Sequence, residues 1–140
     1  IPTVLPSRIT ESFINKIRGQ QSEIVIVTHI NHPNELDEET DKVLRKLRQA
    51  GLALLNQTVL LKAVNDRATI LVELSEKLFN QGVLPYYLHL SDKVEGTQHL
   101  CVTTNTARQL FRDMLKELPG YLVPRLVVEE PGKSSKTLIV

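Results

Sequence analysis

The sequence is poor in cysteine, and Cys101 is its single thiol. One cysteine excludes an internal disulfide framework and any multi-cysteine metal site within this chain. The simplest role for Cys101 is that of a small, half-buried residue. The chain begins at Ile1 rather than methionine, and it lacks the charged start and apolar core of a signal peptide. We therefore expect it to be a piece of a longer protein.

The sequence also has no large excess of either charge and no long apolar run. The 17 Lys and Arg side chains nearly balance the 16 Asp and Glu side chains, which leaves a net charge of +1. No basic run indicates nucleic-acid binding, and no apolar stretch approaches the length of a membrane-spanning helix. A chain of 140 residues, 41% of them hydrophobic, is long enough for one core. We expect a single domain over residues 1–140 without an internal boundary.

Apolar runs and amphipathic stretches alternate along the chain. The β-branched run at 24–27 is typical of a strand buried on both faces. Further strands are predicted over 1–6, 52–55, 83–90 and 122–128. Four amphipathic helices are predicted between them, starting at Thr10, at residues 37–39, at Asn65-Asp66 and at Thr104 or Asn105, and ending at Gly19, Gly51, Gly82 and Pro119-Gly120. Consecutive βα units favour an α/β fold in which helices flank a parallel sheet.

Polar residues follow the predicted strands. They are residues 28–32, Asn56-Gln57, residues 89–92 and residues 129–136. Each group has a plain structural explanation, because histidine, asparagine and aspartate often bind turn backbones or cap helices. Their coincidence at one edge of a parallel sheet nevertheless indicates a ligand site. His29 and His32 as a metal pair is an alternative, although the spacing identifies no third ligand.

The tail presents two lysines, Lys133 and Lys136, just beyond the apolar run 126–128. Lysine is the side chain that condenses with an aldehyde cofactor, and a loop after a buried strand is a suitable place for it. A solvated end rich in Gly, Ser and Lys explains the same stretch without any chemistry. The tail alone therefore leaves both interpretations open.

Several motifs follow one another along the chain. They are residues 28–35, Asn56-Gln57-Thr58-Val59-Leu60-Leu61, Val64-Asn65-Asp66, Pro85-Tyr86-Tyr87, and Pro131-Gly132 followed by Lys136-Thr137. In this order they resemble the C-terminal half of the lysine 2,3-aminomutase family, and the resemblance extends through essentially the whole chain. Those enzymes use radical S-adenosylmethionine and pyridoxal phosphate. The resemblance therefore implies the C-terminal half of a radical S-adenosylmethionine barrel, that is, a partial TIM-type (βα)n barrel.

The resemblance implies roles for five residues. Lys136 falls where the family attaches pyridoxal phosphate covalently, and Asp92 matches the carboxylate that receives the substrate's ε-ammonium. Glu129 stands where other members carry a second aspartate, so the charge is kept on a longer side chain. His29 and Gln57 resemble positions that line the S-adenosylmethionine pocket. The implied substrate is lysine, and the implied reaction moves its amino group from C2 to C3 after a 5′-deoxyadenosyl radical removes a hydrogen atom from the β-carbon.

The chain departs from the family pattern at two places. His89 replaces a tyrosine, and Lys133-Ser134-Ser135 replaces a run of glycines. The sequence Tyr86-Tyr87-Leu88-His89 and the low glycine content at 133–135 resemble the branch that makes β-lysine for attachment to elongation factor P.

The family also binds a 4Fe-4S cluster through three cysteines in a C-x-x-x-C-x-x-C loop. This chain has only Cys101, so the resemblance implies that the cluster ligands and the phosphate-binding arginines lie in a missing N-terminal half. We expect a fragment of a cytoplasmic enzyme that is inactive alone. The exposed edge of its first strand, residues 1–6, should either mediate self-association or be covered by a rearrangement of residues 1–7. A non-catalytic βα binding module and an aminomutase acting on another amino acid are the alternatives.

Overall fold

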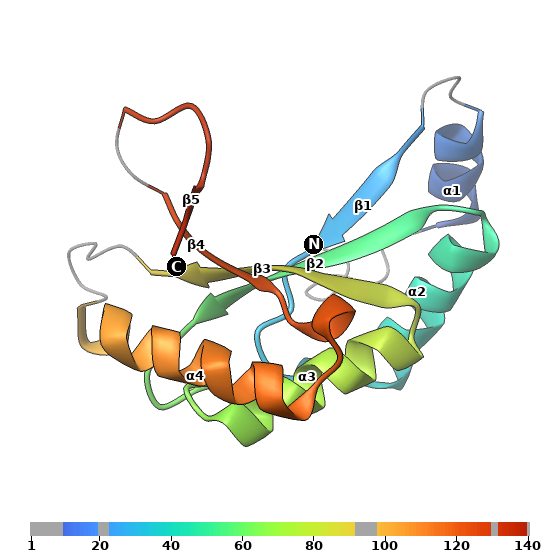
Figure 1. Ribbon diagram of the computed structural model, residues 1–140. Coiled ribbons are helices and arrows are strands. Elements are labelled where there is room, and N and C mark those ends of the chain that lie inside the picture. The colour runs from blue at the N-terminus through green and yellow to red at the C-terminus, as the bar shows by residue number, and fades with distance from the viewer. Residues whose placement is uncertain (1–9, 20–22, 92–97, 130–131, 140) are drawn as a thin grey trace.

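Strands and helices alternate in the computed structural model, which describes residues 10–19, 23–91, 98–129 and 132–139 (Figure 1). The helices are α1 (Glu11–Arg18), α2 (Glu38–Gln49), α3 (Ala68–Asn80) and α4 (Thr104–Glu117). The strands are β1 (Val25–Thr28), β2 (Ala53–Leu60), β3 (Val83–Leu90), β4 (Arg125–Val128) and β5 (Thr137–Leu138). Short 3-10 turns lie at η2 (Pro33–Glu35), η3 (Gln98–Leu100) and η4 (Gly120–Leu122).

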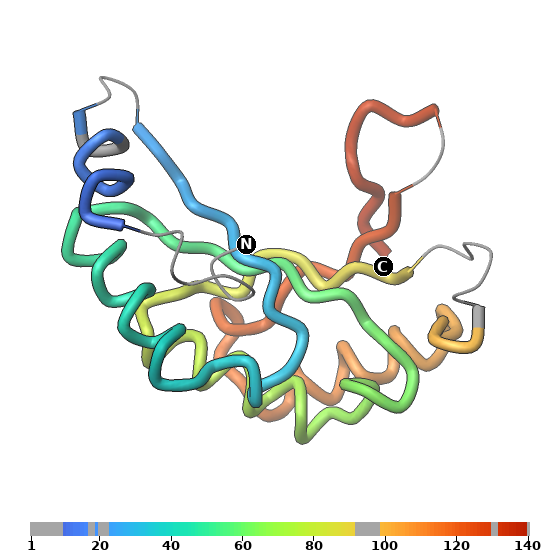
Figure 2. Tube along the Cα trace, turned by 180° about the vertical axis from the view of Figure 1, so that it is seen from behind, coloured from blue at the N-terminus to red at the C-terminus, as the bar shows by residue number. Residues whose placement is uncertain are grey.

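The five strands form one sheet in the order β1-β2-β3-β4-β5. β1 to β4 pair in parallel, and β5 returns antiparallel to β4. Figures 1 and 2 show α2, α3 and α4 together on one face of this sheet. The predicted α/β architecture, a mainly parallel sheet with flanking helices, is therefore confirmed.

The core lies between the sheet and these helices. One buried cluster joins Leu60 and Leu88 of the sheet to Leu71 of α3 and Met114 of α4. A second buried cluster joins Leu54 and Val83 to α2 and α3. Because side chains alternate between the faces of a strand, residues 54, 56, 58 and 60 of β2 are all buried towards the helices.

The strand at 24–27 is not buried on both faces as predicted. β1 spans Val25–Thr28, where Thr28 is fully buried but Val25 is 52% exposed. The physical reason is the one-sided covering of the sheet, since Val25 pairs with Ala53 on the face opposite the helices.

Two of the four helices begin with a capping side chain at the predicted position. The Thr10 hydroxyl accepts from Phe13 N at the start of α1, and the Asp37 carboxylate accepts from Thr40 N at the start of α2. At α4 the cap is Thr103, one residue before the predicted pair. At α3 the prediction of Asn65-Asp66 is wrong, because Arg67 occupies the cap position without a side-chain bond and Asn65 binds backbone elsewhere.

Strand bounds differ more from the predictions. β2 continues to Leu60 rather than stopping at residue 55, so Asn56 and Gln57 lie inside the strand. The predicted strand 122–128 begins only at Arg125, because residues 120–122 form the turn η4 and Pro124 lacks a backbone N–H. β5 was not predicted, and the predicted strand at 1–6 lies outside the described residues.

A buried amide ties the loop after β1 to the sheet. The Asn56 side chain is 1% exposed, and its Oδ1 accepts from the Thr28 hydroxyl at 2.7 Å and from Ile30 N at 2.8 Å. Its Nδ2 donates to Ile30 O and to the Thr58 hydroxyl, both at 3.0 Å. Three of these four hydrogen bonds join Asn56 to Thr28 and Ile30, the two neighbours of His29, and so hold this segment against β2.

A second buried amide, Asn65, extends this support. Its Nδ2 donates to Asn31 O at 2.8 Å and to Val59 O at 2.9 Å, and its Oδ1 accepts from Leu61 N at 2.8 Å. The Asn31 side chain in turn accepts from Val59 N at 2.9 Å. Asn56 and Asn65 thereby fix the segment 29–31.

We predict that Asn56→Ala lowers the free energy of unfolding by about 3 kcal/mol, because it leaves several buried partners without a hydrogen bond. Urea denaturation of the variant and the wild type gives this difference directly. Asn105→Ala is the matched control, since Asn105 is exposed on α4 and should change the unfolding free energy by less than about 0.5 kcal/mol. Equal effects of the two substitutions would contradict the role given to Asn56.

Candidate active site on the face of the sheet opposite the helices

Five polar or aromatic side chains gather on the face of the sheet opposite α2, α3 and α4. We call this the site face and define it by Gln57, Tyr87, His89, Glu129 and Lys136. Gln57 pairs with Tyr87, and His89 pairs with Val127, which pairs with Leu138. Residues paired across a sheet share a face, and so do residues two apart along a strand, which brings Glu129 and Lys136 to the same side.

A β-bulge shapes the middle of the site face. Asn56 pairs with Pro85 but Gln57 pairs with Tyr87, so Tyr86 is an extra residue in β3. The bulge lets two consecutive tyrosines share one face, where their rings stack with centroids 3.8 Å apart and their hydroxyls lie 3.0 Å apart. The hydrogen bond to Tyr87 raises the pKa of Tyr86, so Tyr86 is a neutral phenol at neutral pH.

Lys136 reaches over this aromatic surface. Its Nζ lies 3.2 Å from Glu129 Oε1 and 5.5 Å from the centroid of the Tyr87 ring. The Lys136 side chain is 26% exposed, whereas that of Glu129 is 66% exposed. An amine with a carboxylate on one side and a ring on the other is held in a defined position while solvent still reaches it.

His89 lies between the two ends of the site face. Its Nε2 is 3.2 Å from Gln57 Oε1, a distance at which a protonated Nε2 donates to this oxygen and Nδ1 is the acceptor nitrogen. The Tyr87 ring meets the His89 ring edge-on at 5.7 Å. Burial lowers the pKa of His89, the positive charge of Lys136 lowers it further, Glu129 opposes the shift, and His29 adds to it. His89 is therefore mostly neutral at pH 7.

The predicted site residues fall into three groups. Gln57 meets His89, and Glu129 meets Lys136, so these residues come together on the site face. His29 follows β1 and is exposed, and a positive charge at His29 would lower the pKa of His89. Asp92 lies outside the described residues.

Several polar residues near the site serve the backbone. The His32 Nδ1 accepts from Asn34 N at 3.1 Å, and Glu35 accepts from the backbone N–H groups of Asn31 and His32. The structural explanation of His32 and Asn56 as turn and loop binders is thus correct. Within the described part of the chain no group of three His, Cys, Asp or Glu could hold a metal ion.

Sequence reasoning missed the stacked tyrosines and the central place of His89. The signal for the tyrosines is their adjacency in a strand, but only the bulge brings both rings to one face. His89 alternates with Tyr87 at the spacing that shares a face, which is a visible signal once the strand bounds are known.

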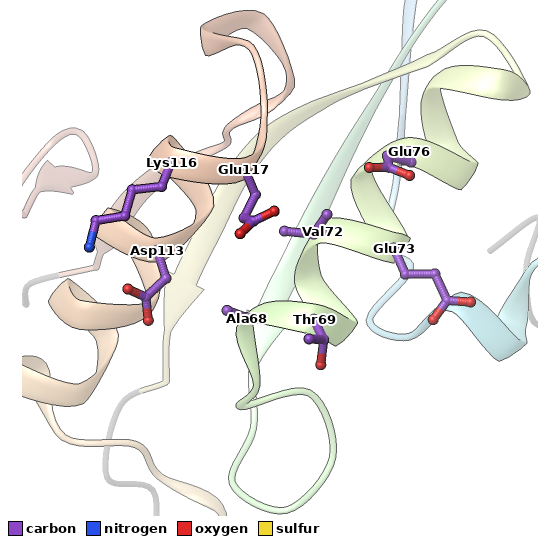
Figure 3. Close-up of a pocket in the computed structure, with 8 residues that line it drawn as sticks. All are labelled: Ala68, Thr69, Val72, Glu73, Glu76, Asp113, Lys116 and Glu117. Carbon is purple, nitrogen blue, oxygen red and sulfur yellow. The ribbon is translucent and has the colours of Figure 1, made fainter.

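A separate pocket lies between α3 and α4, on the helix layer and so on the other side of the sheet from the site face (Figure 3). Its volume is about 410 Å³, and Figure 3 shows carboxylates of both helices around Ala68 and Val72. Its lining residues are Ala68, Thr69, Val72, Glu73, Glu76, Asp113, Lys116 and Glu117. None of the predicted site residues lines it.

Comparison with solved structures identifies the class of fold. A radical SAM methyltransferase from Sphaerobacter thermophilus superposes with a TM-score of 0.60 and 14% identity, over 84% of this chain and 37% of that one. At this identity the likeness shows the fold alone, which is a part of a TIM-type barrel. No protein-family model matches the chain.

The described residues contain no helix long and apolar enough to cross a membrane.

Sequence comparison finds relatives that share one name. The L-lysine 2,3-aminomutase of Escherichia coli K12 is 48% identical over 137 residues, which are 98% of this chain and 40% of that protein. The protein of the same name from Haemophilus influenzae is 47% identical, over 99% of the chain and 41% of the relative. The protein of the same name from Clostridium subterminale is 36% identical, over 99% of the chain and 33% of the relative. Over nearly its whole length the chain matches the lysine 2,3-aminomutase family, as its motifs predicted, and it spans about two fifths of the first of these relatives.

We predict that Lys136→Met raises the pKa of His89, because it removes a positive charge that disfavours the imidazolium form. Glu129→Gln should lower the pKa of His89 further, because it removes the opposing negative charge. Titration of the imidazole signals by NMR measures both shifts. Lys133→Met serves as the control and should leave the His89 titration unchanged. Shifts of the same sign in the Lys136 and Glu129 variants would contradict this geometry.

Proposed function

We propose that this chain forms part of the active site of a lysine 2,3-aminomutase, an isomerase that converts lysine to β-lysine. Two findings support the proposal. The chain matches proteins of that name along almost all of its length, with 48% identity to one of them. The single structural observation that carries it is the Lys136 amine, which is held between the Glu129 carboxylate and the Tyr87 ring on the site face.

Lys136 is the residue that we propose to hold pyridoxal phosphate. The group supplies an electron-accepting ring when bound. The surroundings of Lys136 fit an aldehyde cofactor, because the amine is partly buried, fixed by an ion pair and next to an aromatic wall. The carboxylate of Glu129 orients the ammonium form until its proton is lost, and the neutral Nδ1 of His89 is a second acceptor on the same face.

Substrate selection is assigned to Glu129 and Asp92. The ε-ammonium of lysine requires a carboxylate partner, and a charge-assisted hydrogen bond to it discriminates against shorter amino acids. Glu129 already binds an ammonium group at 3.2 Å in this structure, that of Lys136. Once Lys136 is engaged with its cofactor, the same carboxylate becomes available to the substrate. Asp92 is proposed from its place in the family motif.

His29 and Gln57 are proposed to face S-adenosylmethionine. Their support is the fixed backbone around His29 and the contact of Gln57 with His89, which joins the two halves of the site face. A 4Fe-4S cluster does not fit the residues of this chain, which offers one cysteine for a site that needs three. We therefore expect residues 1–140 alone to be inactive towards lysine.

The finer assignment is to the branch that makes β-lysine for elongation factor P. It rests on the sequence Tyr86-Tyr87-Leu88-His89, which places histidine where other members of the family carry tyrosine. A cytoplasmic location is part of this proposal. Transfer of β-lysine to purified elongation factor P in a coupled assay would test it, and a product that is never transferred would contradict it.

We predict that Lys136 carries the cofactor in the full-length protein. Borohydride reduction in the presence of pyridoxal phosphate should leave a stable phosphopyridoxyl group on one peptide, identified by mass spectrometry. That peptide should be tagged at Lys136 and untagged in Lys136→Met. Lys133 lies three residues away and is the internal control, so a tag on Lys133 instead would refute the assignment.

We predict that Asp92→Asn lowers kcat/KM for lysine by about 2 to 3 kcal/mol of transition-state stabilisation, because the substrate ammonium loses a charged partner. The measurement is steady-state turnover of lysine by the full-length protein with its cofactors. Asp113→Asn on α4 is the matched control and should leave kcat/KM unchanged. An Asp92 variant with wild-type kcat/KM would remove Asp92 from the substrate site.

A further inference from the structure

A groove of about 620 Å³ lies between α4 and the edge of the sheet that β4 and β5 form. Its apolar lining comes from Phe111 and Leu115 of α4, Leu126 of β4, and Leu138 of β5 with the following Ile139. Leu115 and Leu138 remain 49% and 53% exposed. The described residues therefore leave an apolar surface uncovered at this edge.

The groove takes the place of a further helix in the helix layer. α2, α3 and α4 each follow a strand and cover the same face of the sheet (Figure 1). Within the described residues, β4 is followed by a loop and the short strand β5 instead of a helix. α4 thus packs against α3 on one flank and borders the groove on the other. An open apolar groove along a helix is the kind of surface that accepts an amphipathic helix.

Three arginines border the apolar lining, Arg108 and Arg112 from α4 and Arg125 from β4. Arg108 and Arg112 are four residues apart, so they lie on one flank of α4 about 6 Å apart along its axis. In the described part of the chain no carboxylate lies within ion-pair distance of either, and the buried Nε of Arg108 has no hydrogen-bond partner. Uncompensated positive charge therefore surrounds the apolar centre of the groove.

This charge determines which helix fits. Covering guanidinium groups with an apolar surface costs free energy, because they lose water without gaining an acceptor. Carboxylates placed one turn apart on an incoming helix would instead pair with Arg108 and Arg112. Arginine and aromatic side chains around an apolar centre are also enriched at interfaces between proteins.

A second copy of this chain fits the groove poorly. Two grooves that face each other would bring the arginines of both copies together, and like charges repel. Asp113 and Glu117 lie on the other flank of α4, which packs against α3, so they cannot enter a groove as part of a free helix. A contact between that flank and the groove would also be head-to-tail, which forms a ring or an open filament and no closed pair.

We infer that the groove beside Arg108, Arg112 and Leu115 docks an acidic amphipathic helix of a partner protein. The apolar face of that helix covers Leu115 and Leu138, and two of its carboxylates bind the arginines of α4. None of the five residues of the site face lines the groove, so the inference stands independently of the proposed chemistry.

The test uses the full-length protein and a fluorescent synthetic helix of about four turns, with leucines on one face and two glutamates one turn apart beside them. Fluorescence anisotropy measures its Kd, and the same peptide with glutamine in place of both glutamates is the reference probe. We expect the glutamate peptide to bind about tenfold or more tightly than the glutamine peptide. Raising the salt from about 0.05 M to about 0.5 M should weaken its binding several-fold, because screening reduces the attraction.

A double variant, Arg108→Gln with Arg112→Gln, should bind the glutamate peptide about tenfold more weakly and abolish the preference over glutamine. Lys42→Gln with Lys46→Gln is the matched control, since it removes two charges one turn apart on α2 and should change neither Kd. Urea denaturation of both variants checks that they are folded. Equal binding of the two peptides, an unchanged Kd in the arginine variant, or no binding of either peptide to the wild type would refute the inference.

A cross-linking experiment identifies what occupies the groove. A benzophenone amino acid placed at Leu115 of the full-length protein should form a photochemical cross-link to the glutamate peptide, located by mass spectrometry. Cross-links from this position to another part of the same chain would show that the protein covers its own groove. Cross-links between two copies would show that the groove is an interface of an oligomer. Either result would overturn the docking of a partner helix.

Discussion

The alternation of side chains along β2 and β3 determines what each face of the sheet does. Leu54, Leu60 and Leu88 turn towards the helices and are at most 3% exposed, so they supply the apolar burial that stabilises the fold. Residues one position away turn to the opposite face, where Gln57, Tyr87 and His89 are only partly buried. One period-two pattern therefore separates the core from the candidate chemistry.

The bulge at Tyr86 is the one break in this pattern, and it lies at the centre of the site face. Strict alternation along β3 would turn only one of the two tyrosines to the site face, and their rings could not stack there. With the bulge, the two rings stack, and the amine of Lys136, the residue directly before the edge strand β5, lies 5.5 Å from the centroid of the Tyr87 ring. The site face thus depends on the bulge in β3 and on the short antiparallel strand β5.

The arrangement of the loop after β1 depends on a different interaction, the buried amides of Asn56 and Asn65. Both side chains are at most 1% exposed and have hydrogen bonds on their oxygen and their nitrogen. Since a buried amide without partners is costly, these bonds fix the backbone on both sides of His29 in one position. The motif that contains Asn56 and Asn65, predicted to be functional, therefore contributes partly by fixing the backbone of the loop after β1.

The sequence was sufficient for the order of the elements from α1 to β4. It was also sufficient for the bounds of β3, because the run at 83–90 is long, apolar and ended by polar residues. It was insufficient for β2, because Asn56 and Gln57 are residue types common in loops but here continue the strand. Buried hydrogen bonds compensate the polar side chain of Asn56, and the Gln57 side chain lies on the site face beside His89. The meeting of Lys136 with Tyr87 was also beyond sequence reasoning, because β5 has only two residues and no pattern of its own. Family motifs nevertheless pointed to Gln57, Glu129 and Lys136 before any geometry was known.

The central claim is that the chemistry takes place on the site face and not in the pocket of the helix layer. The most direct measurement is a crystal structure of the full-length protein grown with pyridoxal phosphate and lysine. Our account predicts density for the cofactor joined to Lys136, with its ring beside Tyr87 and His89. Cofactor bound between α3 and α4, beside Val72 and Asp113, would contradict it.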